Sequence, residues 1–128
     1  MSGTEAPAAL PALERDVMEE VWQRGEASVR EVMDALNEHG GKTRAYTTYM
    51  TVMARLSRKQ LLVRRRTGKA DLYRPVYTRA EYTDRCAQAA VQSLVDEYGG
   101  VALAHIARQV AELDPSRRRA LERLAHGR

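Results

Sequence analysis

Residues 45–56 read Ala45-Tyr46-Thr47-Thr48-Tyr49-Met50-Thr51-Val52-Met53-Ala54-Arg55-Leu56. Apolar side chains recur there at helical spacing, at Tyr49, Val52, Met53 and Leu56. This spacing predicts a helix that begins near Tyr46 or Thr47 and buries the apolar stripe. The opposite face of the same helix is then left for solvent or for a ligand.

After this helix the hydrophobic period changes from helical to extended. Residues 61–66 and 71–76 are two short runs rich in β-formers, and Thr67-Gly68-Lys69-Ala70 lies between them. This arrangement predicts a β-hairpin. Pro75 has no amide N–H to donate, so the second strand either lies at an edge of the sheet or ends at that residue.

Two further helices are expected before residue 45. The first should follow Pro11 and end at Gly25. Ser28-Val29-Arg30-Glu31 has the pattern of a capping box and should open the second helix, which Gly40-Gly41 should stop. Three short helices followed by a basic hairpin is the element order of a winged helix-turn-helix domain.

From Arg79 onward the pattern is helical again. Gly99-Gly100 and Asp114-Pro115 interrupt this region and predict three helices. Their apolar stripes need cover, and a second copy of the chain is the economical cover because symmetric dimers are the commonest assembly. The residues expected at this dimer interface are Tyr82, Cys86, Ala90, Leu94, Leu103, Ile106, Val110, Leu121 and Leu124.

Positive charge is concentrated in residues 42–79. This segment holds eleven cations and one acid, Asp71, whereas residues 1–41 hold nine acids and three bases, and the whole chain carries only +4. A local excess of this kind attracts a polyanion and releases its condensed counterions on contact. We therefore expect residues 42–79 to bind nucleic acid, although a charge run can also be simply a solvated surface.

The exposed face of the helix at residues 45–56 suits the DNA major groove. Threonine can contact a thymine methyl group, a base edge or a phosphate, and arginine can reach a guanine edge. The recognition-helix residues expected to contact DNA are Thr47, Thr48, Met50, Thr51, Arg55 and Arg58. The predicted β-hairpin at residues 61–76 is the wing of a winged helix-turn-helix domain. Contacts to the DNA backbone, some of them from the wing, are expected from Lys42, Arg44, Tyr46, Lys59, Arg64, Arg66 and Lys69. Thr47 has a second interpretation, as the N-cap of its helix.

These observations define a mainly α-helical chain in three parts. Residues 1–9 are expected to be a disordered tail, residues 10–78 a winged helix-turn-helix DNA-binding domain, and residues 79–128 a helical dimerisation domain.

Residues 45–56, followed by Lys59 and Leu61-Leu62-Val63, resemble the penicillinase-repressor family, the bacterial repressors of β-lactamase and methicillin-resistance genes. Supporting residues are Leu13-Glu14-Arg15-Asp16-Val17-Met18 with Val21-Trp22 in the first helix, and Gly68-Lys69-Ala70 through Tyr73-Arg74-Pro75 in the wing. The resemblance covers residues 10–80 well and the C-terminal helices in length and pattern only. The family usually has an aliphatic residue at the position of Tyr49.

The resemblance implies a homodimer that binds an inverted-repeat operator with TACA/TGTA half-sites. In the antibiotic-resistance branch, a membrane-embedded zinc metalloprotease receptor triggers cleavage of the repressor at an Asn-Phe bond. This chain has no Asn-Phe, and the corresponding region reads Leu103-Ala104-His105-Ile106-Ala107-Arg108-Gln109. The paired cysteines of the copper-responsive branch are likewise absent from Leu124-Ala125-His126-Gly127-Arg128.

The sequence offers no residues for catalysis, a metal or a cofactor. His39, His105 and His126 are scattered, Cys86 lies on an apolar stripe, and no phosphate loop or nucleophile motif is present. Without a secretory signal or an apolar run of membrane length, the chain is expected to be cytoplasmic. The alternative function, from a different class, is a winged-helix protein-interaction module whose basic face binds an acidic partner.

Overall fold

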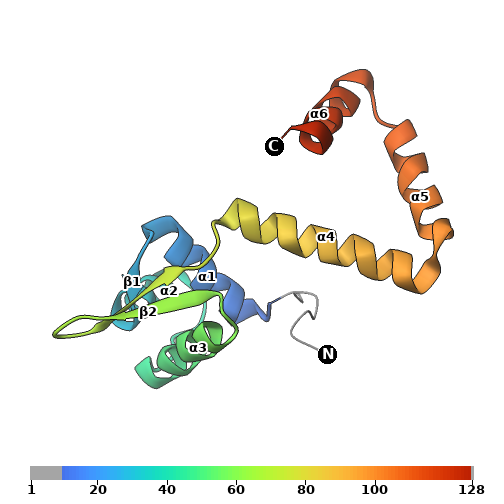
Figure 1. Ribbon diagram of the computed structural model, residues 1–128. Coiled ribbons are helices and arrows are strands. Elements are labelled where there is room, and N and C mark those ends of the chain that lie inside the picture. Colours follow the sequence, from blue (N-terminus) through green and yellow to red (C-terminus); the bar gives the residue numbers. More distant parts are fainter. Residues whose placement is uncertain (1–9, 128) are drawn as a thin grey trace. The chain divides into compact units, whose positions relative to one another are not determined.

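The computed structural model describes residues 10–127, so the tail expected at residues 1–9 lies outside the described range. Within this range the chain forms six helices and three short strands, and Figure 1 shows how they follow one another along the chain. In chain order they are α1 (Ala12–Arg24), β1 (Ala27–Ser28), α2 (Val29–His39), α3 (Tyr46–Arg58), β2 (Leu62–Arg66), β3 (Asp71–Pro75), α4 (Arg79–Tyr98), α5 (Gly100–Ala111) and α6 (Pro115–His126). The mainly helical fold with a hairpin wing confirms the predicted fold class.

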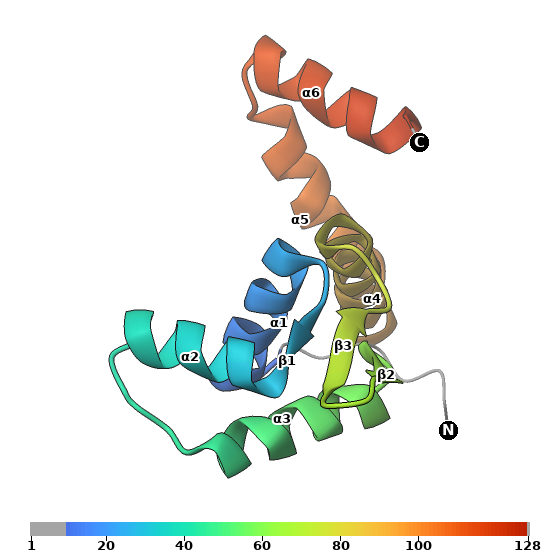
Figure 2. The same ribbon diagram turned by 90° about the vertical axis from the view of Figure 1, so that its left-hand side faces the viewer.

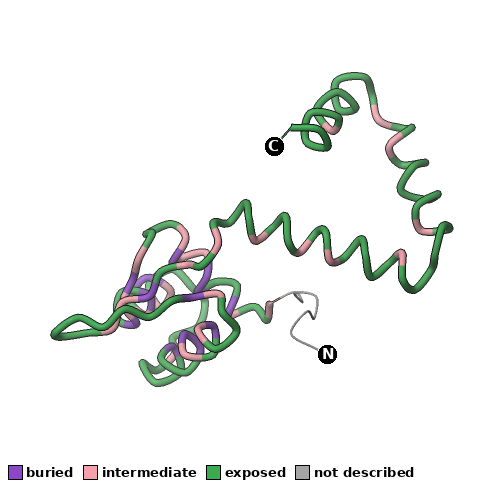
Figure 3. Tube along the Cα trace, in the orientation of Figure 1, coloured by how far each residue is buried: buried purple, intermediate pink, exposed green. Residues whose placement is uncertain are grey.

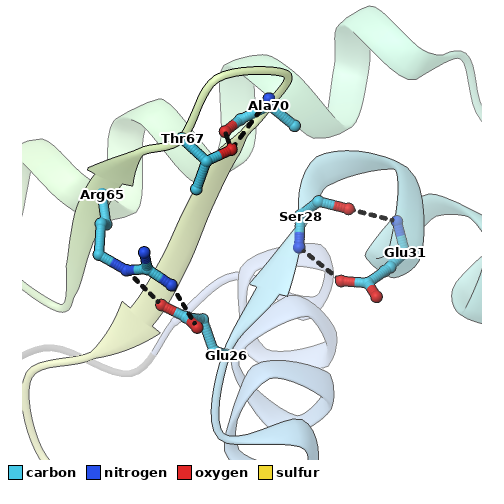
Figure 4. A network of polar contacts seen from close by, with 6 residues as sticks. All are labelled: Glu26, Ser28, Glu31, Arg65, Thr67 and Ala70. Atoms are coloured by element: carbon cyan, nitrogen blue, oxygen red, sulfur yellow. Dashed lines mark hydrogen bonds and ion pairs between the residues drawn. The ribbon is translucent and has the colours of Figure 1, made fainter.

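Local signals in the sequence fix the ends of α1 and α2. Gly25 caps α1 with a φ of 81°, in the left-handed region that glycine enters without strain. Figure 4 shows the capping box of α2, in which the Glu31 N–H donates to Ser28 Oγ at 3.1 Å and the Ser28 N–H donates to Glu31 Oε1 at 2.8 Å. Gly40 follows the last residue of α2. These predicted boundaries are confirmed.

The start of α3 has no side-chain cap. Its N-cap residue is Ala45, which offers no acceptor, and Thr47 is already the second residue of the helix. The interpretation of Thr47 as the N-cap is therefore wrong, and its side chain is exposed on the surface of the helix.

The end of α3 is closed by main-chain bonds. The Leu61 N–H donates to the Leu56 carbonyl at 2.9 Å, and the Gln60 N–H donates to the Ser57 carbonyl at 3.0 Å. This motif places a left-handed residue after the helix cap, commonly glycine. Here Gln60 takes that conformation, with a φ of 66°.

The strands form one antiparallel sheet in the order β1-β3-β2. β3 is therefore the central strand, and the interpretation of Pro75 as a sign of an edge strand is wrong; the other interpretation, that the strand ends there, is right. The pairs of β1 with β3 are Ala27↔Tyr73 and Ser28↔Leu72. Pro75 lies beyond these pairs, so its missing N–H leaves no residue of β1 without a partner.

The core lies between α1, α2, α3 and the sheet. In Figure 2, α3 crosses below α1 and the sheet. The residues of the core cluster are Val17, Met18, Val21, Ala27, Val29, Val32, Tyr49, Val52, Met53, Leu56, Leu62 and Tyr73. The whole predicted stripe of α3 is in this cluster, so the helix is held by one face and presents the other outward.

The C-terminal helices follow the predicted breaks but bury none of their residues (Figure 3). Gly99 precedes α5, and Asp114 caps α6 by accepting a hydrogen bond from the Arg117 N–H at 2.8 Å. The chain divides into two compact units after Cys86, inside α4. The sequence analysis placed the domain boundary at residue 78, and in the structure the first two turns of α4 belong to the winged-helix unit.

Candidate nucleic-acid interface

The outer face of α3 carries the side chains that the sequence analysis assigned to the DNA major groove. They are exposed at Thr47, Thr48, Met50, Thr51 and Arg58. Because these residues alternate with the buried stripe, the core fixes the direction in which they point. The structure thus brings the assigned residues together on one helix face.

The segment before α3 adds cations beside this face. Lys42 is exposed, Arg44 is half-buried, and Tyr46 is 40% exposed at the first position of the helix. The Arg30 guanidinium of α2 lies 5.5 Å from the centroid of the Tyr46 ring, a cation–π contact. Arg30 was not among the predicted site residues, because its place beside α3 depends on how α2 and α3 pack.

A buried carboxylate joins α1 to the end of α3 and the residue after it. Glu14 of α1 is 3% exposed and accepts hydrogen bonds from Lys59 Nζ at 2.7 Å and Arg55 Nη1 at 3.3 Å. Burial acts to raise the pKa of Glu14, but the hydrogen bonds and charges of Lys59 and Arg55 outweigh it and lower the pKa below the usual value. Glu14 therefore holds two of the predicted DNA-contacting cations against α1.

Arg55 and Lys59 nevertheless keep access to solvent. Their side chains are 45% and 42% exposed. The bond from Arg55 uses Nη1, so its Nε–H and Nη2 groups are not engaged by Glu14. Glu14 was not among the predicted site residues, although an acidic residue on the apolar face of α1, near Leu13 and Val17, is a signal that a cation meets it.

An arginine of β2 adds an ion pair to the sheet pairing and core contacts that hold the wing. Arg65 donates to both carboxylate oxygens of Glu26, from Nε at 3.1 Å and from Nη2 at 2.9 Å (Figure 4). The hydrogen bond from Arg65 is the main cause that lowers the pKa of Glu26. At the tip, the Ala70 N–H donates to Thr67 Oγ1 at 3.2 Å and closes the turn.

The other wing cations, Arg64, Arg66 and Lys69, differ in whether they have an acidic partner. Arg64 forms an ion pair with Asp71 at 3.5 Å. Arg66 and Lys69 are exposed and take part in no ion pair within residues 10–127. Among the wing residues predicted to meet the DNA backbone, Arg66 and Lys69 therefore have the fewest competing partners.

A cluster around Trp22 attaches the start of α4 to α1. The Trp22 Nε1–H donates to the Tyr77 carbonyl at 2.8 Å, and its ring centroid lies 5.8 Å from that of Tyr82. Arg79 lies over the Trp22 ring at 5.6 Å and donates from Nε to Glu19 Oε1 at 2.9 Å. These contacts explain why the first turns of α4 belong to the winged-helix unit.

Two residues assigned to the dimer interface lie in this first part of α4. Tyr82 and Cys86 are half-buried. Burial, followed by a hydrogen bond with Cys86, raises the pKa of Tyr82 to about 12. Tyr82 thus uses part of the predicted dimer stripe for a contact inside its own domain.

The remaining residues assigned to the dimer interface lie in α4, α5 and α6. Ala90, Leu94, Leu103, Ile106 and Leu124 are exposed, and Val110 and Leu121 are half-buried. No described residue of these helices is buried.

Residues 10–127 hold neither a cluster of metal-ligand side chains nor a membrane-spanning helix. Within this range no three His, Cys, Asp or Glu side chains gather as a metal-binding group. None of the helices described is both long enough and apolar enough to cross a bilayer.

The geometry agrees with comparisons to known proteins. The model of the penicillinase repressor family matches residues 10–126. The chain belongs to the penicillinase repressor family. This confirms the resemblance inferred from the recognition helix, and it extends the match through the three C-terminal helices.

Two relatives of this repressor are named transcriptional regulator BlaI, from Mycobacterium tuberculosis strains CDC 1551 / Oshkosh and ATCC 25618 / H37Rv. Each is 37% identical over 116 residues, which cover 80% of this chain and 83% of the relative. The solution structure of the DNA binding domain of the repressor BlaI is similar, with a TM-score of 0.50 and 25% identity. That match covers 57% of this chain and 87% of the solved one.

Membership in the penicillinase repressor family defines the general class of function. The chain is a transcriptional repressor with a winged-helix DNA-binding domain, and its family is one of regulators rather than enzymes.

Proposed function

We propose that this repressor binds an inverted-repeat operator as a homodimer, with α3 of each copy in a major groove. The observation that carries the proposal is the outer face of α3, where threonines, Met50 and Arg58 are exposed together and flanked by cations. A helix of this composition offers methyl groups, hydroxyls and guanidinium donors to base edges.

The contacts divide into two kinds. Thr47, Thr48, Met50 and Thr51 face the base edges, and Arg55 and Arg58 reach a base or a phosphate. The residues that contact the DNA backbone are Lys42, Arg44, Tyr46, Lys59, Arg64, Arg66 and Lys69. The first kind determines which sequence is bound, and the second supplies affinity that falls with salt.

The homodimer forms through the exposed apolar faces of α4, α5 and α6. A pair of identical chains presents two recognition helices related by a two-fold axis, so an inverted repeat is the matching DNA sequence. The TACA/TGTA consensus of the family resemblance is the starting choice for the half-sites.

The test is an anisotropy titration with two labelled duplexes of equal length at about 150 mM salt, near physiological ionic strength. One duplex carries a TACA/TGTA dyad and the other a scrambled sequence. We expect tight binding to the dyad alone. Equal weak binding to both duplexes would contradict the proposed operator, and high affinity for an acidic protein instead would favour the interaction-module alternative.

Two variants separate the two kinds of contact. Thr51→Val keeps the shape of an exposed side chain but loses its hydroxyl, and should weaken dyad binding by about 0.5–1.5 kcal/mol, as for one hydrogen bond, without changing scrambled-duplex binding. Lys69→Ala should weaken binding to the dyad and to the scrambled duplex about equally. It should also reduce the slope of log affinity against log salt concentration by about 1. Gln23→Ala, at an exposed position of α1, is the matched control and should change neither.

A further inference from the structure

The link between α2 and α3 is six residues long, 40–45, and carries Lys42 and Arg44 into the proposed interface. One side chain fixes its end. Asn37, in the last turns of α2, donates from Nδ2 to the Arg44 carbonyl at 2.9 Å and accepts from the Arg44 N–H at 3.0 Å through Oδ1. Both main-chain polar groups of Arg44 are therefore bound to one carboxamide.

A second bond connects this carboxamide to the inside of the recognition helix. Tyr49 of α3 is 0% exposed, and its hydroxyl donates to Asn37 Oδ1 at 2.8 Å. Asn37, Arg44 and Tyr49 form the turn network, in which three hydrogen bonds join the end of α2, the link and the fourth residue of α3. The ring of Tyr49 packs in the core, so the network is attached to the core through one residue.

The core holds the inner face of α3, and the turn network adds the side-chain hydrogen bonds that hold the residues just before the helix. Its N-cap, Ala45, makes no side-chain hydrogen bond, and Gly40 and Gly41 leave the start of the link free of side chains. Buried or half-buried polar groups that exchange such bonds specify one arrangement of the chain, since leaving a partner unbonded costs free energy.

We propose that Asn37 and Tyr49 are positioning residues for operator recognition. Through the turn network they set where Arg44 and the first turn of α3 lie on DNA, and therefore which base edges Thr47 and Thr48 reach. This role rests on the proposed function. Both side chains are bound within the chain: Tyr49 faces the core, and the Asn37 carboxamide bonds to Arg44 and Tyr49.

The decisive variant is Tyr49→Phe, which removes only the hydroxyl and keeps the buried ring. The matched control is Tyr73→Phe, the same change at a buried tyrosine of β3 that lies outside the network. Asn37→Ala removes all three bonds, and its coupling to Tyr49→Phe is measured in a double-mutant cycle.

The full chain is titrated with the dyad and scrambled duplexes, and exchange of the Arg44 amide hydrogen is followed without DNA. We expect Tyr49→Phe to lower the ratio of dyad to scrambled affinity by about fivefold, as for the loss of one hydrogen bond. Scrambled-duplex affinity should fall less than dyad affinity, the Arg44 amide should exchange faster, and Tyr73→Phe should behave as wild type. The double variant should lose less than the sum of the single variants.

A Tyr49→Phe chain that is less stable yet keeps the wild-type affinity ratio would overturn the proposal, because the network would then be merely structural. Unchanged exchange at Arg44 in Asn37→Ala would also overturn it. A wild-type chain that does not prefer the dyad, despite slow exchange at Arg44, would overturn the proposed function and with it the role of the network in recognition.

Discussion

The winged-helix unit and the C-terminal helices place the same kinds of apolar residue in opposite environments. In residues 10–86, Met53 and Leu56 are 0% exposed and belong to one core. In residues 87–127, Leu94, Leu103 and Leu124 are 44%, 50% and 81% exposed. The first unit therefore contains its own hydrophobic core, whereas the helices of the second unit expose their apolar side chains on the surface.

This difference indicates what each part needs in order to be stable. Isolated helices of about 12 residues are marginal in water, and their stability in proteins comes from packing an apolar face. α5 and α6 have 12 residues each and bury none of them. The winged-helix unit can fold from its own contacts, while the C-terminal helices need a further surface, which we propose is a second copy of the chain.

The contrast in burial is tested most strongly by truncating one leucine in each part. Leu56→Ala should destabilise the winged-helix unit by about 2–5 kcal/mol, because it opens a cavity in a closed core. Leu124→Ala should leave the stability of the winged-helix unit within about 0.5 kcal/mol of wild type, because Leu124 lies in the separate C-terminal unit and is 81% exposed in the single chain. Urea unfolding followed by circular dichroism measures both; similar losses would contradict the contrast.

A charge in the apolar stripe of α5 should separate the copies. Ile106→Asp places a carboxylate on the proposed dimer face, whereas His105→Asp places one on the opposite face of the same helix and is the matched control. Sedimentation equilibrium should show monomers for Ile106→Asp, and dyad affinity should fall by about 100-fold because the two domains no longer bind together. A dimeric Ile106→Asp chain would place the interface elsewhere.

The ion pairs of Glu14 should make stability depend on pH. Because the folded-state pKa of Glu14 is lowered, its contribution is present above its unfolded pKa of about 4.5 and is lost as pH falls through the lower folded value. Glu14→Gln should cost about 1–3 kcal/mol at neutral pH, as expected for hydrogen bonds to charged groups. As pH falls from 7 to about 3, the difference in unfolding free energy between Glu14→Gln and the wild type should shrink. A difference that stays constant with pH would contradict this account of Glu14.

The attachment of α4 to α1 should contribute least. Trp22→Phe keeps an aromatic ring but removes the Nε1–H bond to the Tyr77 carbonyl, and should cost about 1 kcal/mol in urea unfolding. Tyr98→Phe, at a 56% exposed ring in the other unit, is the control and should have no measurable effect. Equal losses for the two variants would show that the Trp22 cluster does not stabilise the junction.

Much of the fold was predictable because its signals are local. The capping box at Ser28, the glycines at positions 25 and 40, and the stripe of α3 each act within a few residues of chain. β1 was not predictable, because two residues are too few to show alternation and their pairing partner lies in β3. The left-handed Gln60 was also unmarked, since glycine is the usual signal at that position.

The candidate site was predictable only where one helix defines it. Periodicity assigned the outer face of α3 correctly as exposed, but not the partners that hold its flanks. Glu14 meets Arg55 and Lys59 across 41 and 45 positions of sequence, and Arg65 meets Glu26 across 39. Such pairs depend on how elements pack, so a count of charges along the chain cannot assign them.

The most direct test of the division between the two parts is a titration of the full chain into two duplexes of equal length, with the mass of each complex measured by native mass spectrometry. One duplex carries the TACA/TGTA dyad and the other carries a single half-site. We expect two chains on the dyad, and binding to the single half-site that is weaker by about 100-fold. One chain per duplex with equal affinity for both would contradict the account.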